Sequence, residues 1–291
     1  MSKEAALIQA LRALAPHPAA RGLMDDCAVI DFGSETLILT HDMMAEGIHW
    51  LPEQDLADVA WKLVASNLSD LASKGAEPVG VLLGFMLGEG DERFIAGLGE
   101  ALAAFAVPLL GGDTISSNGA RSLGLTAIGR ATSRPVPDRR GASPGDSLWV
   151  TGPVGAAMLG FEALRDGTPA AATAFRRPVP RLAEGCALAP LVSAMMDISD
   201  GLLIDAARMA DASGICLAMT ASTIPFPPEL PEHRKGDAMR WGEDYELLFT
   251  LPPGKAPPVP AFRIGAAITR GDDPLLIDGA PPSGRLGYTH D

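Results

Sequence analysis

The stretch MMDISDGLLID, residues 195–205, places three aspartates among methionine, isoleucine and leucine side chains. The apolar run at its start predicts a strand over 194–199, and the pattern from 200 to 214 predicts a helix that Gly214 ends. Ser199 or Asp200 would cap this helix, and Asp205, considered alone, would be a solvated helix position. A strand, a glycine turn and a helix in succession are typical of α/β proteins.

The same succession extends through both halves of the chain. In the first half we predict strands over 35–44, 78–88, 107–114 and 122–131, and helices over 55–75 and 91–106. Asp55 would cap the first of these helices and Gly75 would end it, whereas 107–114 (VPLLGGDT) would be a buried strand that opens into a glycine turn. In the second half we predict a strand, glycine turn and helix over 147–164, a helix over 180–192 and a strand over 244–252. Residues 132–146, rich in proline, glycine and arginine, form the best domain boundary.

Composition and charge narrow the class of protein. The 291 residues are 47% hydrophobic and 20% charged, as in a globular protein with a sizeable core, and their formal net charge is −13. This charge argues against a nucleic-acid partner, because phosphate contacts require clustered lysine and arginine. Metal ions can still join an acidic protein to phosphates. The three cysteines are too dispersed for a disulfide framework or a zinc site.

We expect neither a targeting segment nor a membrane span. Leu7, Leu11 and Leu14 have helical spacing, and the first residues lack the long apolar stretch and the cleavage site of a signal peptide. The apolar stretch 94–112 is interrupted by Glu100 and Pro108. The simplest interpretation is a cytoplasmic protein.

Acidic residues recur where a predicted strand ends or a glycine turn begins. They are Asp25, Asp26, Asp42, Asp113, Asp197, Asp200, Glu243 and Asp244; Asp70 instead lies on a predicted helix, three residues after Asn67. Any one of them is explained by a turn or a helix cap. As a group in apolar surroundings they would repel one another unless cations intervene, and Mg²⁺ prefers such oxygen ligands together with substrate phosphates. Acids, metal and phosphate predict phosphoryl transfer or another ATP-dependent reaction.

The usual nucleotide-binding signatures are absent from the sequence. It contains no G-x-x-x-x-G-K-[ST] motif, no G-x-G-x-x-G after the early strands and no protein-kinase motif set. A nucleotide site in this chain would therefore depend on metal ions and glycine turns.

Nine segments in a fixed order resemble the thiamine-monophosphate kinase family. This family belongs to the superfamily that includes aminoimidazole ribonucleotide synthetase and selenophosphate synthetase. The segments are DDCAV, THDMMAEGIHW, NLSDLASKGAEP, LLGGDT, SLGLTAIG, RRGASPGDSLWVTGPVG, RPVPRLAEG, MMDISDGLLID and GEDYELLFT. They cover residues 22 to 250, and EGIHW, NLSD and GEDYEL favour this family over its relatives.

The resemblance implies a reaction, ligands and site residues. ATP would donate its γ-phosphoryl group in line to thiamine monophosphate, with several Mg²⁺ ions bridging the two sets of phosphates. The positions that match the family's magnesium ligands are Asp26, Thr40, Asp42, Asp70, Asp113, Asp197 and Asp200. Those that match its nucleotide contacts are Gly112, Asp113, Arg139 and Ser199, and those that match its substrate contacts are His49, Glu243 and Tyr288. Glu243 would pair with the thiazolium or the aminopyrimidine ring, and no residue serves as a covalent nucleophile.

The chain departs from the family pattern at a few positions. Met24 and Trp241 replace glycines, and His41 replaces the threonine before an aspartate. Arg285 stands where an aromatic side chain often stacks on the substrate, and Asp291 replaces a terminal phenylalanine. All of the predicted carboxylate ligands are retained.

The resemblance also implies an architecture with two domains. Residues 1–133 would form an N-terminal α/β domain that binds ATP and magnesium, and residues 137–291 a C-terminal α+β domain. The N-terminal sheets of two subunits would form a barrel across a homodimer, although the apolar run VGVLLGFML fits a monomer's core equally well. Two other functions fit the same motifs: another ATP-dependent synthetase of the superfamily, and a protein that binds Mg-ATP without kinase activity.

Overall fold

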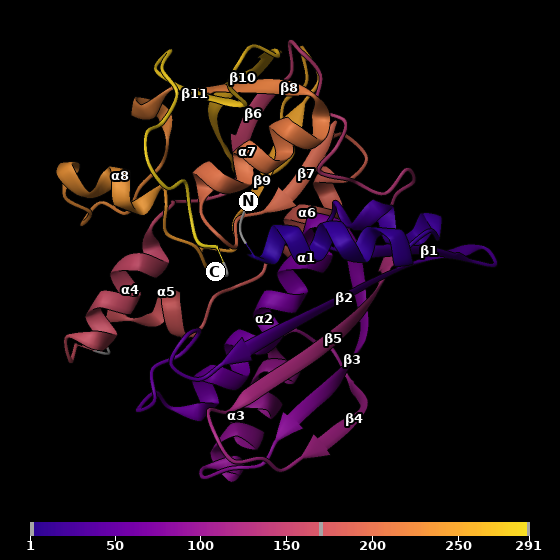
Figure 1. Ribbon diagram of the computed structural model, residues 1–291, viewed down its shortest axis with the longest axis vertical. Coiled ribbons are helices and arrows are strands. Elements are labelled where there is room, and N and C mark those ends of the chain that lie inside the picture. Colours follow the sequence, from indigo (N-terminus) through magenta and orange to yellow (C-terminus); the bar gives the residue numbers. More distant parts are fainter. Residues whose placement is uncertain (1–2, 169–170, 290–291) are drawn as a thin grey trace.

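The first half of the chain folds around a five-stranded mixed sheet (Figure 1). The computed structural model describes residues 3–168 and 171–289, so Asp291 lies outside the described residues. The strands are β1 (Ala28–Phe32), β2 (Glu35–Ala45), β3 (Ala76–Met86), β4 (Leu109–Ile115) and β5 (Ser122–Ala131), in the order β1-β2-β5-β3-β4. Only β3 and β4 are parallel, and the other neighbours are antiparallel.

Two helices, α2 (Leu56–Ser73) and α3 (Asp91–Ala104), pack beside this sheet. The side chain of Asp55 accepts a hydrogen bond from the backbone N–H of Ala57, and Gly75 follows the helix with a φ of 59°, so both predicted ends are confirmed. The two helices are in close contact at Gly97, where a Cβ atom would lie 2.2 Å from the Cα of Ala57. Shorter helical segments precede the sheet: α1 (Lys3–Leu11), η1 (Arg12–Leu14) and η2 (Pro18–Leu23).

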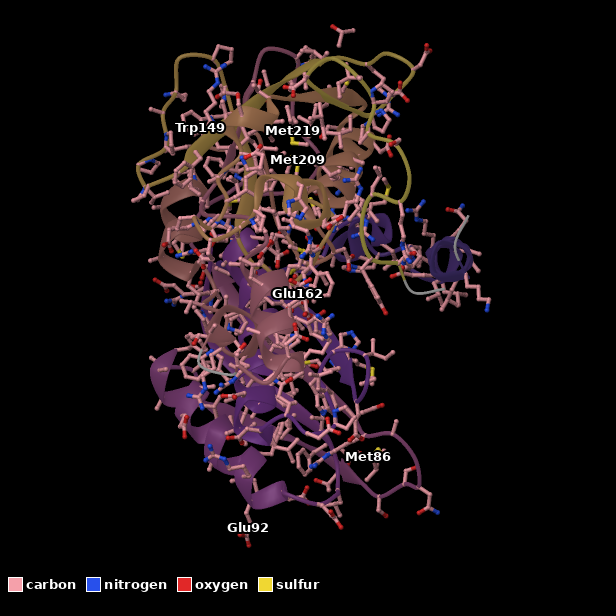
Figure 2. The ribbon with its side chains drawn as sticks, turned by 90° about the vertical axis from the view of Figure 1, so that its left-hand side faces the viewer. Met86, Glu92, Trp149, Glu162, Met209 and Met219 are labelled. Atoms are coloured by element: carbon pink, nitrogen blue, oxygen red, sulfur yellow. The ribbon has the colours of Figure 1, made fainter. Side chains whose placement is uncertain are left out.

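The second half folds around a six-stranded mixed sheet, in the order β11-β8-β10-β6-β9-β7. Its strands are β6 (Ser147–Val150), β7 (Ala194–Asp197), β8 (Ile215–Met219), β9 (Leu247–Leu251), β10 (Phe262–Thr269) and β11 (Leu275–Ile277). Its helical segments are α4 (Ala156–Arg165), α5 (Thr173–Arg176), α6 (Leu182–Leu188), α7 (Leu202–Ser213), η4 (Ala221–Thr223), η5 (Glu232–Arg234) and α8 (Lys235–Ala238). Figure 2 shows Met209 and Met219 in this upper half, where both are buried, and Met86 in the lower half.

Helix α2 is the structural link between the two halves. It contacts β2 and β5 on one side and α6 and β7 on the other, which leaves almost all of its residues buried. A Cβ atom at Gly185 of α6 would lie 2.0 Å from the carbonyl oxygen of Ala72, so the two helices approach as closely as glycine permits. Buried Asp58 also pairs with Arg176 and Arg177, at 2.5 Å each.

Two sequence predictions about this fold are wrong in detail. Strand β4 exists, but all of its residues are exposed at the edge of the sheet, and the two glycines lie inside the strand rather than in a turn. Two strands were not predicted: β1, and β8, which is short and buried. No helix in the described part of the chain is long and apolar enough to cross a membrane.

Candidate active site

A cavity of about 570 Å³ lies between the two halves of the chain. Many of the residues that were predicted to act together line it: Asp26, Asp42, His49, Asp70, Asp197, Ser199, Asp200, Glu243 and Tyr288. They come from strand ends, from helix α2, from the loop before β9 and from the C-terminal tail. Residues up to 262 positions apart in the sequence thus share one space, where they could bind a single set of ligands.

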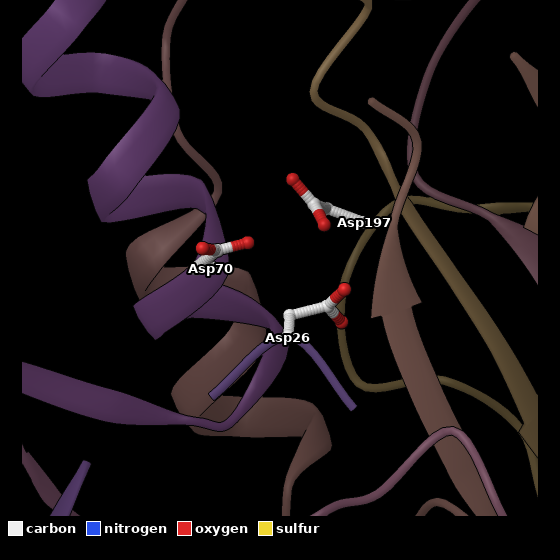
Figure 3. A group of neighbouring side chains, drawn as sticks. All are labelled: Asp26, Asp70 and Asp197. Carbon is white, nitrogen blue, oxygen red and sulfur yellow. The ribbon is translucent and has the colours of Figure 1, made fainter. Parts of the chain in front are cut away.

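Three carboxylates form the acidic end of this cavity (Figure 3). Asp26 precedes β1, Asp70 lies on α2, and Asp197 is the last residue of β7. One oxygen from each lies within 4.8 Å of the others. A cluster of carboxylate oxygens is the donor set that hard divalent cations such as Mg²⁺ take, so the residues present fit that ion.

The electrostatics of the acidic end favour a bound cation. Burial, with the charges of Asp26 and Asp200, raises the pKa of Asp42 to about 6. Burial and the charge of Asp26 raise the pKa of Asp197 to about 8, and the hydroxyl of Ser69 donates a 2.6 Å hydrogen bond to it. Burial, followed by the charges of Asp42 and Asp197, also raises the pKa of Asp70 well above its usual range. A divalent ion would remove this mutual repulsion.

Basic side chains next to the carboxylate cluster neutralise Asp25 and Asp26. Lys74, which is fully buried, lies 2.7 Å from Asp25, and Arg21 lies 2.5 Å from the same carboxylate. Although burial opposes its ionisation, these two cations lower the pKa of Asp25 to about 2. Arg139 pairs with Asp26 and has a buried Nε without a hydrogen-bond partner. Of the adjacent acids, Asp25 is therefore structural, whereas Asp26 faces the cavity.

Asp205, the third aspartate of MMDISDGLLID, shapes the loop rather than lining the cavity. Its buried carboxylate accepts hydrogen bonds from the backbone N–H groups of Ser199, Asp200 and Gly201, at 3.0–3.2 Å. The N-cap residue is Gly201, so the predicted caps at Ser199 and Asp200 are wrong, as is a solvated Asp205. Arg208 pairs with both Asp200 and Asp205, which fixes the loop that follows β7.

The lining of the cavity also has an aromatic part, which we call its aromatic end. Phe161, Phe175, Trp241 and Tyr288 form it, and the Phe161 ring lies 5.1 Å from Trp241 and 5.3 Å from Phe175. Arg285 also lines it, 5.8 Å from the ring of Tyr288. The backbone N–H of Ala45 donates to Nδ1 of His49, at 3.0 Å. This end of the cavity has the apolar surface and the few polar groups that a flat organic ring requires.

Among the described residues, four that were predicted to belong to the site do not line the cavity. Thr40 and Arg139 are directly behind it, bonded to Asp70 and Asp26. Gly112 and Asp113 are on the exposed strand β4.

His41 also lies away from the acidic end. Successive residues of a strand point to opposite faces, so His41 is on the face of the sheet opposite Asp42, where its Nδ1 lies 2.8 Å from Oγ1 of Thr126. This replacement of the family's threonine therefore leaves the acidic cluster unchanged.

Sequence reasoning missed several residues beside the cavity. Lys62 is fully buried on α2, and Lys74 is fully buried directly after that helix, whereas the helical periodicity pointed only to the apolar stripe. Neither lysine carried a clear signal, because the predicted helix over 55–75 contains five charged residues and a lysine on a helix is usually solvated. Phe161 and Phe175 carried no signal, because an isolated phenylalanine in a helix is usually part of a core.

Comparisons with known proteins agree with this fold. The family models for the N-terminal and the C-terminal domain of AIR synthase related protein match residues 24–131 and 143–258. The thiamine-monophosphate kinase of Caulobacter vibrioides is 37% identical over 269 residues, which are 86% of this chain and 76% of that protein. That of Salmonella typhimurium is 36% identical over 249 residues, which are 79% of this chain and 76% of that protein. The solved structure of AaThiL complexed with AMPPCP and TMP has a TM-score of 0.88 at 27% identity, and the match covers 97% of this chain and 96% of that one.

The two family models together match most of the chain, so its two mixed α/β units have the fold of the AIR synthase related class. Within that class, the chain belongs to the thiamine-monophosphate kinase family. The resemblance inferred from the nine sequence segments is thereby confirmed.

Proposed function

We propose that this protein transfers the γ-phosphoryl group of ATP to the phosphate of thiamine monophosphate, forming thiamine diphosphate and ADP. The observation that carries the proposal is a single cavity with an acidic end at Asp26, Asp70 and Asp197 and an aromatic end at Phe161 and Trp241. The acceptor has the same polarity, with an anionic phosphate on one side and two flat rings on the other. Membership of the kinase family supports the same assignment.

The acidic end would hold Mg²⁺. Its ligands would come from Asp26, Thr40, Asp42, Asp70, Asp113, Asp197 and Asp200. Bound Mg²⁺ neutralises phosphate charge and so lowers the repulsion between the two anionic reactants. Gly112, Asp113, Arg139 and Ser199 would contact the nucleotide, and His49, Glu243 and Tyr288 the acceptor. The residues of the chain would act by binding and orientation, in a direct in-line transfer without a covalent intermediate.

A homodimer would account for the residues that lie apart from the cavity. Strand β4 presents Leu109, Leu110 and Ile115 at the sheet edge, each about half exposed, and such an edge is a template for pairing with another chain. In the assembly we propose, the N-terminal sheets of two chains form a barrel. Gly112 is three strands from Asp42 in the cross-strand register, roughly 14 Å at the usual strand spacing. Its strand would therefore contribute where the two sheets meet.

We also propose the domain limits as residues 1–133 and 137–291. The two sheets support this division, since β5 ends at Ala131 and β6 begins at Ser147. The N-terminal domain would supply the ATP and magnesium ligands and the dimer interface, and the C-terminal domain would supply the aromatic end of the cavity.

Incubation with ATP, Mg²⁺ and thiamine monophosphate tests the proposal. We expect thiamine diphosphate and ADP in equal amounts, and no product when Mg²⁺ is chelated. Turnover of ATP that does not require thiamine monophosphate would instead indicate a synthetase. Binding of Mg-ATP without any product would indicate a protein that has lost catalysis.

A further inference from the structure

Lys62 of α2 places a positive charge directly behind the wall of the cavity. Its side chain is 1% exposed, and its ammonium lies 2.5 Å from Oε1 of Glu243. The same ammonium donates a 2.9 Å hydrogen bond to the carbonyl oxygen of His49 and lies 3.7 Å from the ring centre of Phe175. A buried charge is costly unless it is paired, so the ammonium and its partners constrain one another.

The three partners of Lys62 belong to separate segments that all line the cavity. His49 follows β2, Phe175 is in α5, and Glu243 precedes β9. A lysine ammonium has three donors, so one side chain can fix a carbonyl group and a carboxylate at once. Lys62 thus joins the N-terminal and C-terminal walls of the cavity at the positions predicted to contact the acceptor.

Glu243 depends on such a partner for its orientation. Its backbone has a φ of 69°, a conformation that is uncommon for residues other than glycine and asparagine. Its N–H donates to the carbonyl oxygen of Ser199, but its carboxylate is partly exposed to the cavity. Burial lowers the pKa of Lys62, and the carboxylate of Glu243 opposes that change. The pair consequently contributes little net charge to this end of the cavity.

We propose that Lys62 is a positioning residue, which holds Glu243 so that its second carboxylate oxygen accepts a hydrogen bond from an amino group of the acceptor. This inference rests on the proposed function and selects between the two rings that Glu243 was predicted to contact. A carboxylate already paired with an ammonium is a poor counter-ion for a thiazolium cation, but it remains a good hydrogen-bond acceptor. The recognised group is therefore the amino group of the pyrimidine ring.

Steady-state kinetics with two acceptors test the inference. The acceptors are thiamine monophosphate and the analogue in which a carbonyl oxygen replaces the pyrimidine amino group. Wild type should prefer the amino compound, and Lys62→Met should reduce that preference in kcat/KM by about tenfold, the loss expected for one charge-assisted hydrogen bond. The KM for ATP should change less than about twofold, because none of the three described partners of Lys62 belongs to the carboxylate cluster of Asp26, Asp70 and Asp197.

Two further variants make the result decisive. Lys255→Met makes the same chemical change at an exposed position and should leave the preference unchanged. Lys62→Met combined with Glu243→Gln leaves no buried charge unpaired, so it keeps the test valid if the single variant fails to fold, and it should show the same loss.

The possible failures are distinguishable. If wild type forms no thiamine diphosphate, the proposed function is wrong and this inference is wrong with it. If wild type is active and the folded Lys62 variants keep the preference, or lose affinity for ATP and acceptor equally, only the role of Lys62 is refuted.

Discussion

Replacement of Asp42 by asparagine should stabilise the metal-free protein and at the same time inactivate it. Burial, with repulsion from Asp26 and Asp200, raises the pKa of Asp42 from 3.8 to about 6. Each pKa unit corresponds to about 1.4 kcal/mol, so ionised Asp42 costs the fold up to about 3 kcal/mol above pH 6. Asparagine has nearly the same shape and carries no charge. The melting temperature of the metal-free Asp42→Asn protein should therefore be higher than that of the metal-free wild type by roughly 5–10 °C at pH 8.

Thermal denaturation at pH 8 measures this effect, first with a chelator and then with Mg²⁺. Wild type should gain stability from Mg²⁺, whereas Asp42→Asn should gain much less, and its turnover should fall by about 10³-fold or more. Asp272→Asn makes the same change on an exposed loop and should match wild type in both measurements. A metal-free Asp42→Asn protein that melts below wild type would refute the electrostatic reasoning, and near-normal turnover would refute the assignment of Asp42 as a metal ligand.

Three other changes probe separate parts of the site. Without metal, stability to urea should fall as the pH rises from about 4 to about 8, because Asp42 and Asp197 ionise near pH 4 in the unfolded chain but keep their protons in the folded protein up to about pH 6 and pH 8; a flat profile would contradict this. Asp205→Ala should lower the free energy of unfolding by about 3–5 kcal/mol, since it leaves three backbone N–H groups without their acceptor and Arg208 with Asp200 alone; a loss below about 1 kcal/mol would show that the loop is fixed by other contacts. Trp241→Ala should raise the KM for thiamine monophosphate about tenfold and leave that for ATP unchanged, and an equal change in both would contradict an aromatic acceptor site.

Local sequence patterns predicted the elements that carry Asp70 and Asp197 but not strand β1, which follows Asp26. Asp197 ends a strand, and the apolar run before it and the glycine after it are both visible in the sequence. Asp70 follows Asn67 on a helix whose N-cap and C-terminal end were also predicted from the sequence. Asn67 is fully buried, and its side-chain oxygen accepts a hydrogen bond from the backbone N–H of Asp42. Such features depend on neighbours within a few residues, and for this reason one sequence suffices to find them.

The features that were missed depend on tertiary contacts. Strand β4 has the composition of a core strand, but its position at the sheet edge is set by strand order, which its own residues do not encode. Asp205 resembles a solvated helix residue until the loop before α7 folds over it. The role of Lys62 depends on its contact with Glu243, which lies 181 positions later in the sequence, so the residues around Lys62 do not predict it.

The central claim is that carboxylates from both halves of the chain and the phosphates of ATP bind the same metal ions. The most direct measurement is the melting temperature with Mg²⁺ alone, with a non-hydrolysable ATP analogue alone, and with both. Shared ions predict that the two ligands together raise the melting temperature by more than the sum of their separate effects, and that Asp197→Asn abolishes the excess. Simple additivity in the wild-type protein would contradict the account.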